Sequence, residues 1–171
     1  ISVDESYKTV SALRKNKSLY RYLVTSSRYN TDCSFSTSGV LGGNGTDRAI
    51  AEFFKDESCE RYEIKEKTPF STTRKYSAVE LECGDVYIKG APEIIISGCK
   101  YALDSSGNRV PMSRGEIESR YRAYAEGGSR VIGVAYRGKD DSGAIFLALI
   151  VLKDKLRTGV RDSVLGVKRA G

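Results

Sequence analysis

Apolar positions recur along the chain with two periods, and these periods predict its helices and strands. A spacing of three and four residues, or a helix-start signal before an apolar run, predicts helices at 16–27, 47–54, 92–102 and 113–128. Before the second of these lies a glycine-rich loop, and Thr46 is expected to cap the helix. Its apolar stripe comprises Ala49, Ile50, Phe53 and Phe54.

Alternating β-branched, aromatic and polar residues predict strands at 61–70, 74–83, 86–90, 130–138 and 144–154. Gly84-Asp85 reads as a hairpin turn, 104–110 as a hairpin-like loop and 139–143 as a turn. Residues 1–13 are expected to be a linker with a short extended piece, and 157–171 to begin another helix. Hairpin-linked strands with interspersed helices predict an α+β fold: a mostly antiparallel β-sheet flanked by helices, with one face covered.

Composition narrows the chemistry that the chain can perform. It has 171 residues and no histidine, which excludes Ser-His and Cys-His nucleophile pairs and HExxH metal sites. The cysteines Cys33, Cys59, Cys83 and Cys99 are scattered, so buried reduced thiols fit better than a zinc site. A net charge of +6 and a pI of about 9.1 favour an anionic partner, either a phosphate ligand or nucleic acid. The basic residues are dispersed, which weakens the nucleic-acid interpretation.

The stretch GDVYIKGAPEIII, residues 84–96, ends a predicted strand with Lys89 and opens a helix at Pro92. Gly90 removes side-chain bulk directly after the lysine, which permits a ligand or another backbone to come close. Taken alone, the stretch is more often the mark of a solvated surface lysine before an ordinary strand-to-helix turn.

Two more stretches suit a phosphate-bearing ligand, although each also has a structural explanation. Residues 42–49, GGNGTDRA, place glycines before a helix N-terminus, but the stretch has neither P-loop nor GxGxxG order. A plain loop with an N-cap is the commoner explanation. In TPFSTTRKYS, residues 68–77, Phe70 precedes Arg74 and Lys75, which suits a base stack beside a phosphate. A core phenylalanine beside solvated charges is the alternative.

In their order along the chain, these stretches resemble the nucleotide-binding domain of P-type cation-transporting ATPases, in particular the calcium-pump-like group. The motifs that carry the resemblance are GTDRA, PFSTTRKYS, KGAPE, GSRVIGVAYR and DKLR, between about Lys17 and the end. The resemblance implies three segments. Residues 1–15 would be a linker from a phosphorylation domain, 16–153 the nucleotide-binding domain, and 154–171 a hinge and the start of the returning segment.

The resemblance also implies roles for individual residues. Phe70 would stack on adenine, and Lys89 would line the floor of its pocket, with Gly90 and Ala91 letting the base approach the backbone. Asp47 would accept a hydrogen bond from the adenine amino group, although the family usually has Glu there. Lys75 and Arg130 would face the ribose or phosphates. Many members carry an arginine where this chain has Thr72, so Arg74 is a candidate substitute; Asp154 and Arg157 match the hinge.

The function implied is ATP binding for a membrane pump that uses Mg²⁺ and transports a cation, expected to be Ca²⁺. The family's phosphorylated Asp-Lys-Thr-Gly-Thr motif does not occur in this sequence, so the chain is expected to bind ATP without hydrolysing it. Its partners would be the phosphorylation and actuator domains and the transmembrane helices, with no nucleic acid. It would be a monomeric, soluble cytoplasmic domain of an integral protein of the cell membrane. The alternatives are a single-stranded nucleic-acid-binding module and a scaffold without a ligand.

Overall fold

The structure, a computed structural model, describes residues 7–37, 39–104 and 106–153, which form five helices and nine strands. In chain order these are α1 Val10–Leu13, α2 Lys17–Tyr29, β1 Cys33–Ser36, β2 Gly39–Gly42, α3 Gly45–Phe53, β3 Ile64–Thr68, β4 Tyr76–Leu81, β5 Val86–Gly90, α4 Pro92–Gly98, β6 Cys99–Leu103, β7 Arg109–Pro111, α5 Arg114–Glu126, β8 Arg130–Arg137 and β9 Ala144–Leu152.

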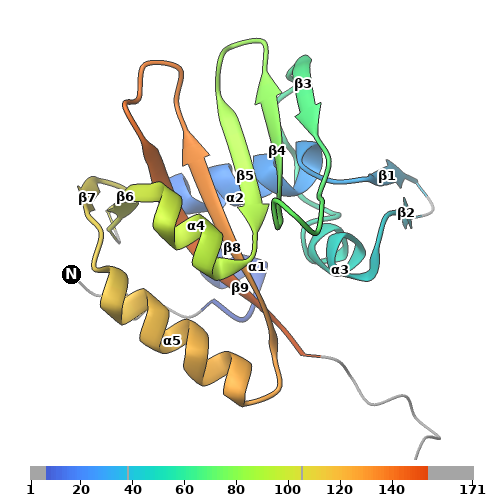
Figure 1. Ribbon diagram of the computed structural model, residues 1–171. Coiled ribbons are helices and arrows are strands. Elements are labelled where there is room, and N and C mark those ends of the chain that lie inside the picture. The colour runs from blue at the N-terminus through green and yellow to red at the C-terminus, as the bar shows by residue number, and fades with distance from the viewer. Residues whose placement is uncertain (1–6, 38, 105, 154–171) are drawn as a thin grey trace, which may run out of the picture.

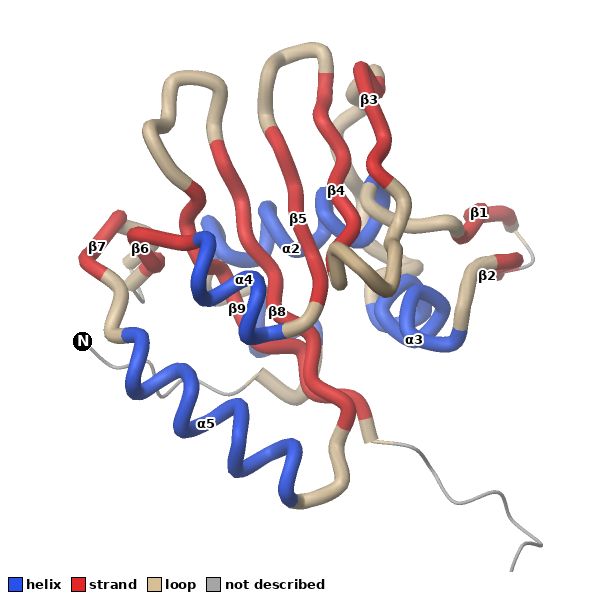
Figure 2. Tube along the Cα trace, viewed as in Figure 1, coloured by secondary structure: helices blue, strands red, loops and turns tan. Residues whose placement is uncertain are grey.

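A seven-stranded sheet with the order β3-β4-β5-β8-β9-β6-β7 forms the centre of the fold (Figure 1). Each neighbouring pair is antiparallel except β6 with β9. The strands β1 and β2 pair only with each other and stand apart from this sheet, beside α3 (Figure 2). The predicted α+β fold with a mostly antiparallel sheet and flanking helices is confirmed.

Helices cover both faces of the sheet, so the expectation of a single covered face is wrong. On one face, α2 and α3 share a core with Val134 of β8 and Leu147 of β9. On the other, α4 and α5 share a core with Ala135 and Phe146, which neighbour those residues and point the opposite way. Figure 1 shows α2 behind the sheet and α4 and α5 in front. Two buried faces explain why β8 and β9 read as nearly continuous apolar runs.

Several local predictions need correction. The cap of α3 is Asn44 and not Thr46: the Asn44 side chain accepts the amide of Asp47 at 2.9 Å. The helix that starts at Pro92 ends at Gly98, and the next five residues form β6. The end of the predicted extended piece is the short helix α1, and the hairpin β1–β2 was not predicted. The predicted helix in 157–171 lies outside the described residues.

The cysteines are all free, but only Cys99 is buried; Cys83 is exposed and the other two are half-buried. The prediction of four buried thiols is therefore wrong. Within residues 7–37, 39–104 and 106–153, no helix has the length and apolarity that a membrane crossing needs.

Candidate functional site

A cavity of about 550 Å³ opens where the N-terminus of α3 meets β3, β4, β5 and the start of β8. Its volume lies in the range of small-molecule sites. Six of the candidate residues line it: Asp47, Phe70, Lys89, Gly90, Ala91 and Arg130. A second cavity of about 620 Å³, beside the β1–β2 hairpin, contains none of them.

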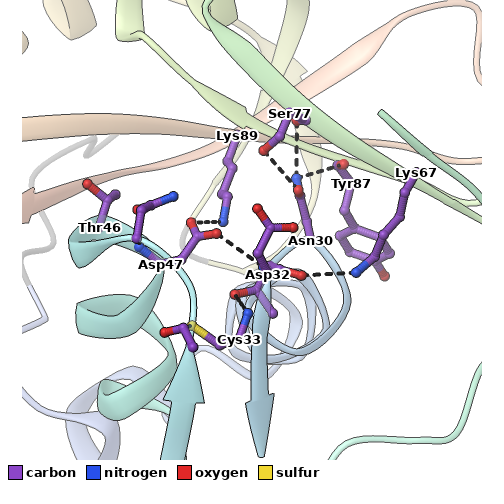
Figure 3. Close-up of polar contacts among 12 residues, drawn as sticks. Asn30, Asp32, Cys33, Thr46, Asp47, Lys67, Ser77, Tyr87 and Lys89 are labelled. Carbon is purple, nitrogen blue, oxygen red and sulfur yellow. Dashed lines mark hydrogen bonds and ion pairs between the residues drawn. The ribbon is translucent and has the colours of Figure 1, made fainter. Parts of the chain in front are cut away.

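Lys89 and Asp47 form an ion pair in this cavity (Figure 3). Asn44 fixes Asp47 in the first turn of α3, where a carboxylate also complements the helix dipole. Lys89 follows Tyr87 by two residues in β5 and therefore points to the α2 and α3 side of the sheet. The Lys89 and Asp47 side chains are only 11% and 7% exposed. The interpretation of Lys89 as a solvated surface lysine is wrong.

The peptide group between Thr31 and Asp32 is held at both ends beside this pair. Its carbonyl oxygen accepts from Nζ of Lys67 at 2.9 Å, and its N–H donates to Oδ2 of Asp47 at 3.2 Å. The hydroxyl of Thr31 also accepts the amide of Cys33 at 3.1 Å. Three segments that are far apart in the sequence thus meet at one peptide group.

A second polar network lies behind the ion pair. Asn30 caps the C-terminus of α2, and its side-chain amide donates to the carbonyls of Ser77 at 3.2 Å and Tyr87 at 3.1 Å. The Ser77 hydroxyl in turn donates to Oδ1 of Asn30 at 2.9 Å. Burial raises the pKa of the Tyr87 phenol above its ordinary value, so the phenol stays neutral there. Asn30 and Ser77 are buried and bonded to each other, so they form a wall of the cavity.

Gly90 is required by a neighbouring backbone. A Cβ at this position would lie 2.4 Å from the carbonyl oxygen of Lys75, which also accepts the amide of Ala91 at 2.9 Å. Lys75 itself has a φ of 59°, and its ammonium pairs with Glu93 at 3.6 Å. Lys75 does not line the cavity.

Phe70 lies at the mouth of the cavity on the turn between β3 and β4, and its side chain is 56% exposed. An exposed aromatic ring beside a cavity is available for stacking. Arg74 closes the same turn by donating to the carbonyl of Pro69 at 3.0 Å. Neither Arg74 nor Thr72 lines the cavity.

Arg130, the first residue of β8, lines the cavity beside the N-terminus of α3. Its Nη1 donates to the hydroxyl of Thr46 at 3.0 Å. A guanidinium has five N–H donors, so this bond leaves most of them for an anionic ligand.

Comparison with known proteins identifies the family. A family model described as "P-type ATPase, cytoplasmic domain N" matches residues 22–159, which is most of the chain. The chain belongs to this family. The resemblance inferred from the motifs is therefore confirmed, and the chain is a nucleotide-binding (N) domain of a P-type ATPase.

The N domain is also similar to calcium-transporting ATPases. It is 33% identical over 150 residues to "Calcium-transporting ATPase PAT1" of Dictyostelium discoideum, which covers 75% of this chain and 14% of that protein. It is 31% identical over 152 residues to "Probable calcium-transporting ATPase 9, plasma membrane-type" of Oryza sativa subsp. japonica, covering 75% and 15%. It is 27% identical over 184 positions to "Calcium-transporting ATPase 1" of Yarrowia lipolytica, covering 96% and 20%. The chain thus spans between 14% and 20% of the length of these relatives.

Several polar residues that line the cavity of this N domain were not among the predicted site residues, including Asn30, Asp32, Lys67 and Ser77. Their signal in the sequence is weak, because polar residues in loops and at strand ends are usually solvated. The described ranges contain no group of three or more acidic, cysteine or histidine residues that could hold a metal ion. The hinge candidates Asp154 and Arg157 lie outside those ranges.

Proposed function

We propose that this N domain binds ATP in the 550 Å³ cavity, with the adenine stacked on Phe70. The observation that carries the proposal is the exposed Phe70 ring at the mouth of a cavity that also contains cationic side chains. An aromatic face suits any purine, and cations suit the phosphates. Membership of the P-type ATPase N-domain family supports the same ligand.

At the base end, Lys89, Gly90 and Ala91 form the floor against which adenine lies. The backbone of Lys75 occupies the space that a Cβ of residue 90 would take. The role of Gly90 is therefore to let β4 and β5 approach each other at the floor. Asp47 holds Lys89 against α3 and has further acceptor positions on its carboxylate for the adenine amino group.

At the phosphate end, Arg130 is the cation with the clearest access to the cavity. Lys75 would reach the phosphates from outside the cavity, after exchanging its exposed partner Glu93 for the ligand; that pair is weak, because both side chains are about half exposed. Arg74 and Thr72 are not assigned a phosphate contact.

In the whole protein, we propose that this domain holds ATP while its γ-phosphate passes to an aspartate of a separate phosphorylation domain. The relatives named as calcium-transporting ATPases support Ca²⁺ as the transported ion and a membrane location. Residues 16–153 would be the N domain proper. Residues 1–15 and 154–171, with Asp154 and Arg157, would join it to the phosphorylation domain. The chain alone is expected to bind ATP without hydrolysing it, and Mg²⁺ is expected to matter little for binding because the base makes most contacts.

An NMR titration with ATP, with and without Mg²⁺, tests the proposal. The amides of Phe70, Lys89 and Arg130 should shift, and saturation should occur at modest affinity because few contacts offset the entropy of association. Phe70→Ala and Lys89→Ala should weaken binding while the spectrum remains that of a folded protein. Tyr124→Ala, which removes an exposed aromatic ring from α5, outside the cavity, is the control and should bind as wild type. Unchanged affinity in both Phe70→Ala and Lys89→Ala would refute the assignment.

A gel shift with single-stranded oligonucleotides distinguishes ATP binding from the alternative function, single-stranded nucleic-acid binding. A nucleic-acid-binding module would shift the oligonucleotide, and the shift would weaken steeply with salt. An ATP-binding domain should leave the oligonucleotide free at moderate salt.

A further inference from the structure

We infer that Asp32 and Lys67 read the edge of the purine base, an inference that rests on the proposed ATP site. Both side chains line the cavity and both are exposed. The resemblance to the family pointed to Asp47 and Lys89, but those two groups line the cavity already paired with each other, which leaves each of them less bonding capacity for a ligand.

The unused bonding capacity at the base end belongs mainly to Asp32 and Lys67. Lys67 donates one of its three N–H groups to the Thr31 carbonyl at 2.9 Å, which leaves two for a ligand. The carboxylate of Asp32 has no hydrogen bond or ion pair with the described residues, and within them it does not pair with Lys67. By contrast, the Asn30 amide and the Ser77 hydroxyl already bond each other and backbone carbonyls.

The backbone that carries Asp32 is fixed before any ligand arrives. Its amide bonds Asp47, and the carbonyl of the same peptide group bonds Lys67. Figure 3 shows Asp32 between the Lys89–Asp47 pair and Lys67. A side chain on a backbone held in this way loses little freedom on binding, which favours its use as a specific contact.

The sheet register puts Lys67 at the base end of the cavity, and the bond of the Asp32 amide to Asp47 puts Asp32 beside it. Lys67 is opposite Val79 in β4, and Val79 is opposite Tyr87 in β5, which precedes Lys89 by two residues. Lys67 therefore lies one step behind Lys89 on the same face, farther from Arg130 than the pocket floor is. A nucleotide with its phosphates at Arg130 and its base on Phe70 would direct the base edge toward Asp32 and Lys67.

One acceptor beside one donor matches adenine. The N6 amino group of adenine is a donor next to the acceptor N7, whereas guanine has two acceptors, O6 and N7, on this edge. Asp32 would accept from N6 and Lys67 would donate to N7. The Asp32 carboxylate would oppose O6 of guanine, so the pocket should prefer ATP to GTP.

Calorimetric titration of the 171-residue chain with matched nucleotides tests each contact. Asp32→Ala should weaken the binding of ATP about fivefold. It should leave the affinity for purine riboside triphosphate, which lacks the amino group, unchanged. Lys67→Met should weaken ATP by about the same factor but leave 7-deaza-ATP, which lacks N7, unchanged. The controls Asp140→Ala and Lys65→Met make the same charge changes at exposed positions outside the cavity and should alter neither nucleotide.

The outcomes distinguish this inference from the proposed function. If Asp32→Ala weakens ATP and purine riboside triphosphate equally, or affects neither, Asp32 does not read the base. If Lys67→Met weakens ATP but not AMP, Lys67 contacts a phosphate and its assignment fails. A wild-type chain that does not bind ATP at all would instead refute the proposed function. Binding that depends on Phe70 but not on Asp32 or Lys67 would overturn only the inference made here.

Discussion

The ion pair between Asp47 and Lys89 is predicted to stabilise the fold as well as the cavity. Its side chains are 7% and 11% exposed, so removing one partner leaves a charge with little access to water. For fully buried pairs such a loss costs about 3–5 kcal/mol. This pair borders a cavity that water can enter, and Asp47 keeps the amide of Asp32 as a partner. We therefore expect about 2 kcal/mol for either Lys89→Met or Asp47→Asn.

The double variant should cost less than the sum of the single variants, because each second change removes the charge that the first left unpaired. We expect a coupling free energy of about 1–2 kcal/mol. Urea unfolding followed by circular dichroism gives the free energies of unfolding, and unchanged m-values would confirm that compactness is not altered.

The Lys65–Glu80 pair is the matched control. Its nitrogen and oxygen are 2.6 Å apart, but the side chains are 55% and 29% exposed. Exposed pairs of this kind couple by about 0.2–1 kcal/mol. A coupling in the Asp47–Lys89 cycle no larger than in the Lys65–Glu80 cycle would refute the reasoning, since burial would then have no effect on the pair.

Three further changes test other parts of the structure. A hydrogen bond from Tyr20 is the main cause that lowers the pKa of Glu57 below its ordinary 4.5, so its stabilisation is present above that pH and lost as the pH falls through the lowered pKa. Glu57→Gln should therefore lower the urea midpoint at pH 7 and flatten its fall below pH 4.5; a curve parallel to wild type would contradict this. Gly90→Ala would put a Cβ 2.4 Å from a carbonyl oxygen and should cost about 1–3 kcal/mol in urea unfolding, whereas Gly98→Ala meets open space and should not destabilise. Burial raises the pKa of Cys99 to about 12, so this thiol should react with a disulfide reagent at pH 8 only after unfolding, and reaction of the folded protein there would disprove its burial.

The elements that the sequence predicted well are those whose pattern is local. In β4, buried positions alternate with half-buried ones, and in the first half of α2 the buried Leu19 and Leu23 lie one turn apart, as their periods predict. β6 was wrongly included in a helix because its residues continue the apolar run of α4. What makes it a strand is pairing on both sides, with β7 a few residues later and with β9 more than 40 residues farther along, and the periodicity of its own residues records neither. The second covered face was missed for the same reason.

The site residues that belong to a sequence motif were predictable, but the contacts between residues far apart in the sequence were not. All six candidate residues that line the cavity belong to short motifs, in which Phe70 and Lys89 stand out by chemistry and order. The partner of Lys89 is 42 residues away, so its pairing with Asp47 is a property of the fold. Lys67 and Asp32 belong to no motif. The sheet register places Lys67 beside the pocket floor, and the bond of its amide to Asp47 places Asp32 there.

The carboxylate of Asp47 contributes both to the stability of the fold and to the position of the proposed base-reading residue. Through Oδ1 it holds Lys89, which fixes α3 on the sheet, and through Oδ2 it holds the amide of Asp32, the proposed base reader. Because residues in one network do not act additively, Asp47→Asn should change both stability and base preference, whereas Asp32→Ala should change base preference alone. The two variants differ because Asp47 bonds both Lys89 and the Asp32 amide, whereas the Asp32 carboxylate bonds no other group among the described residues.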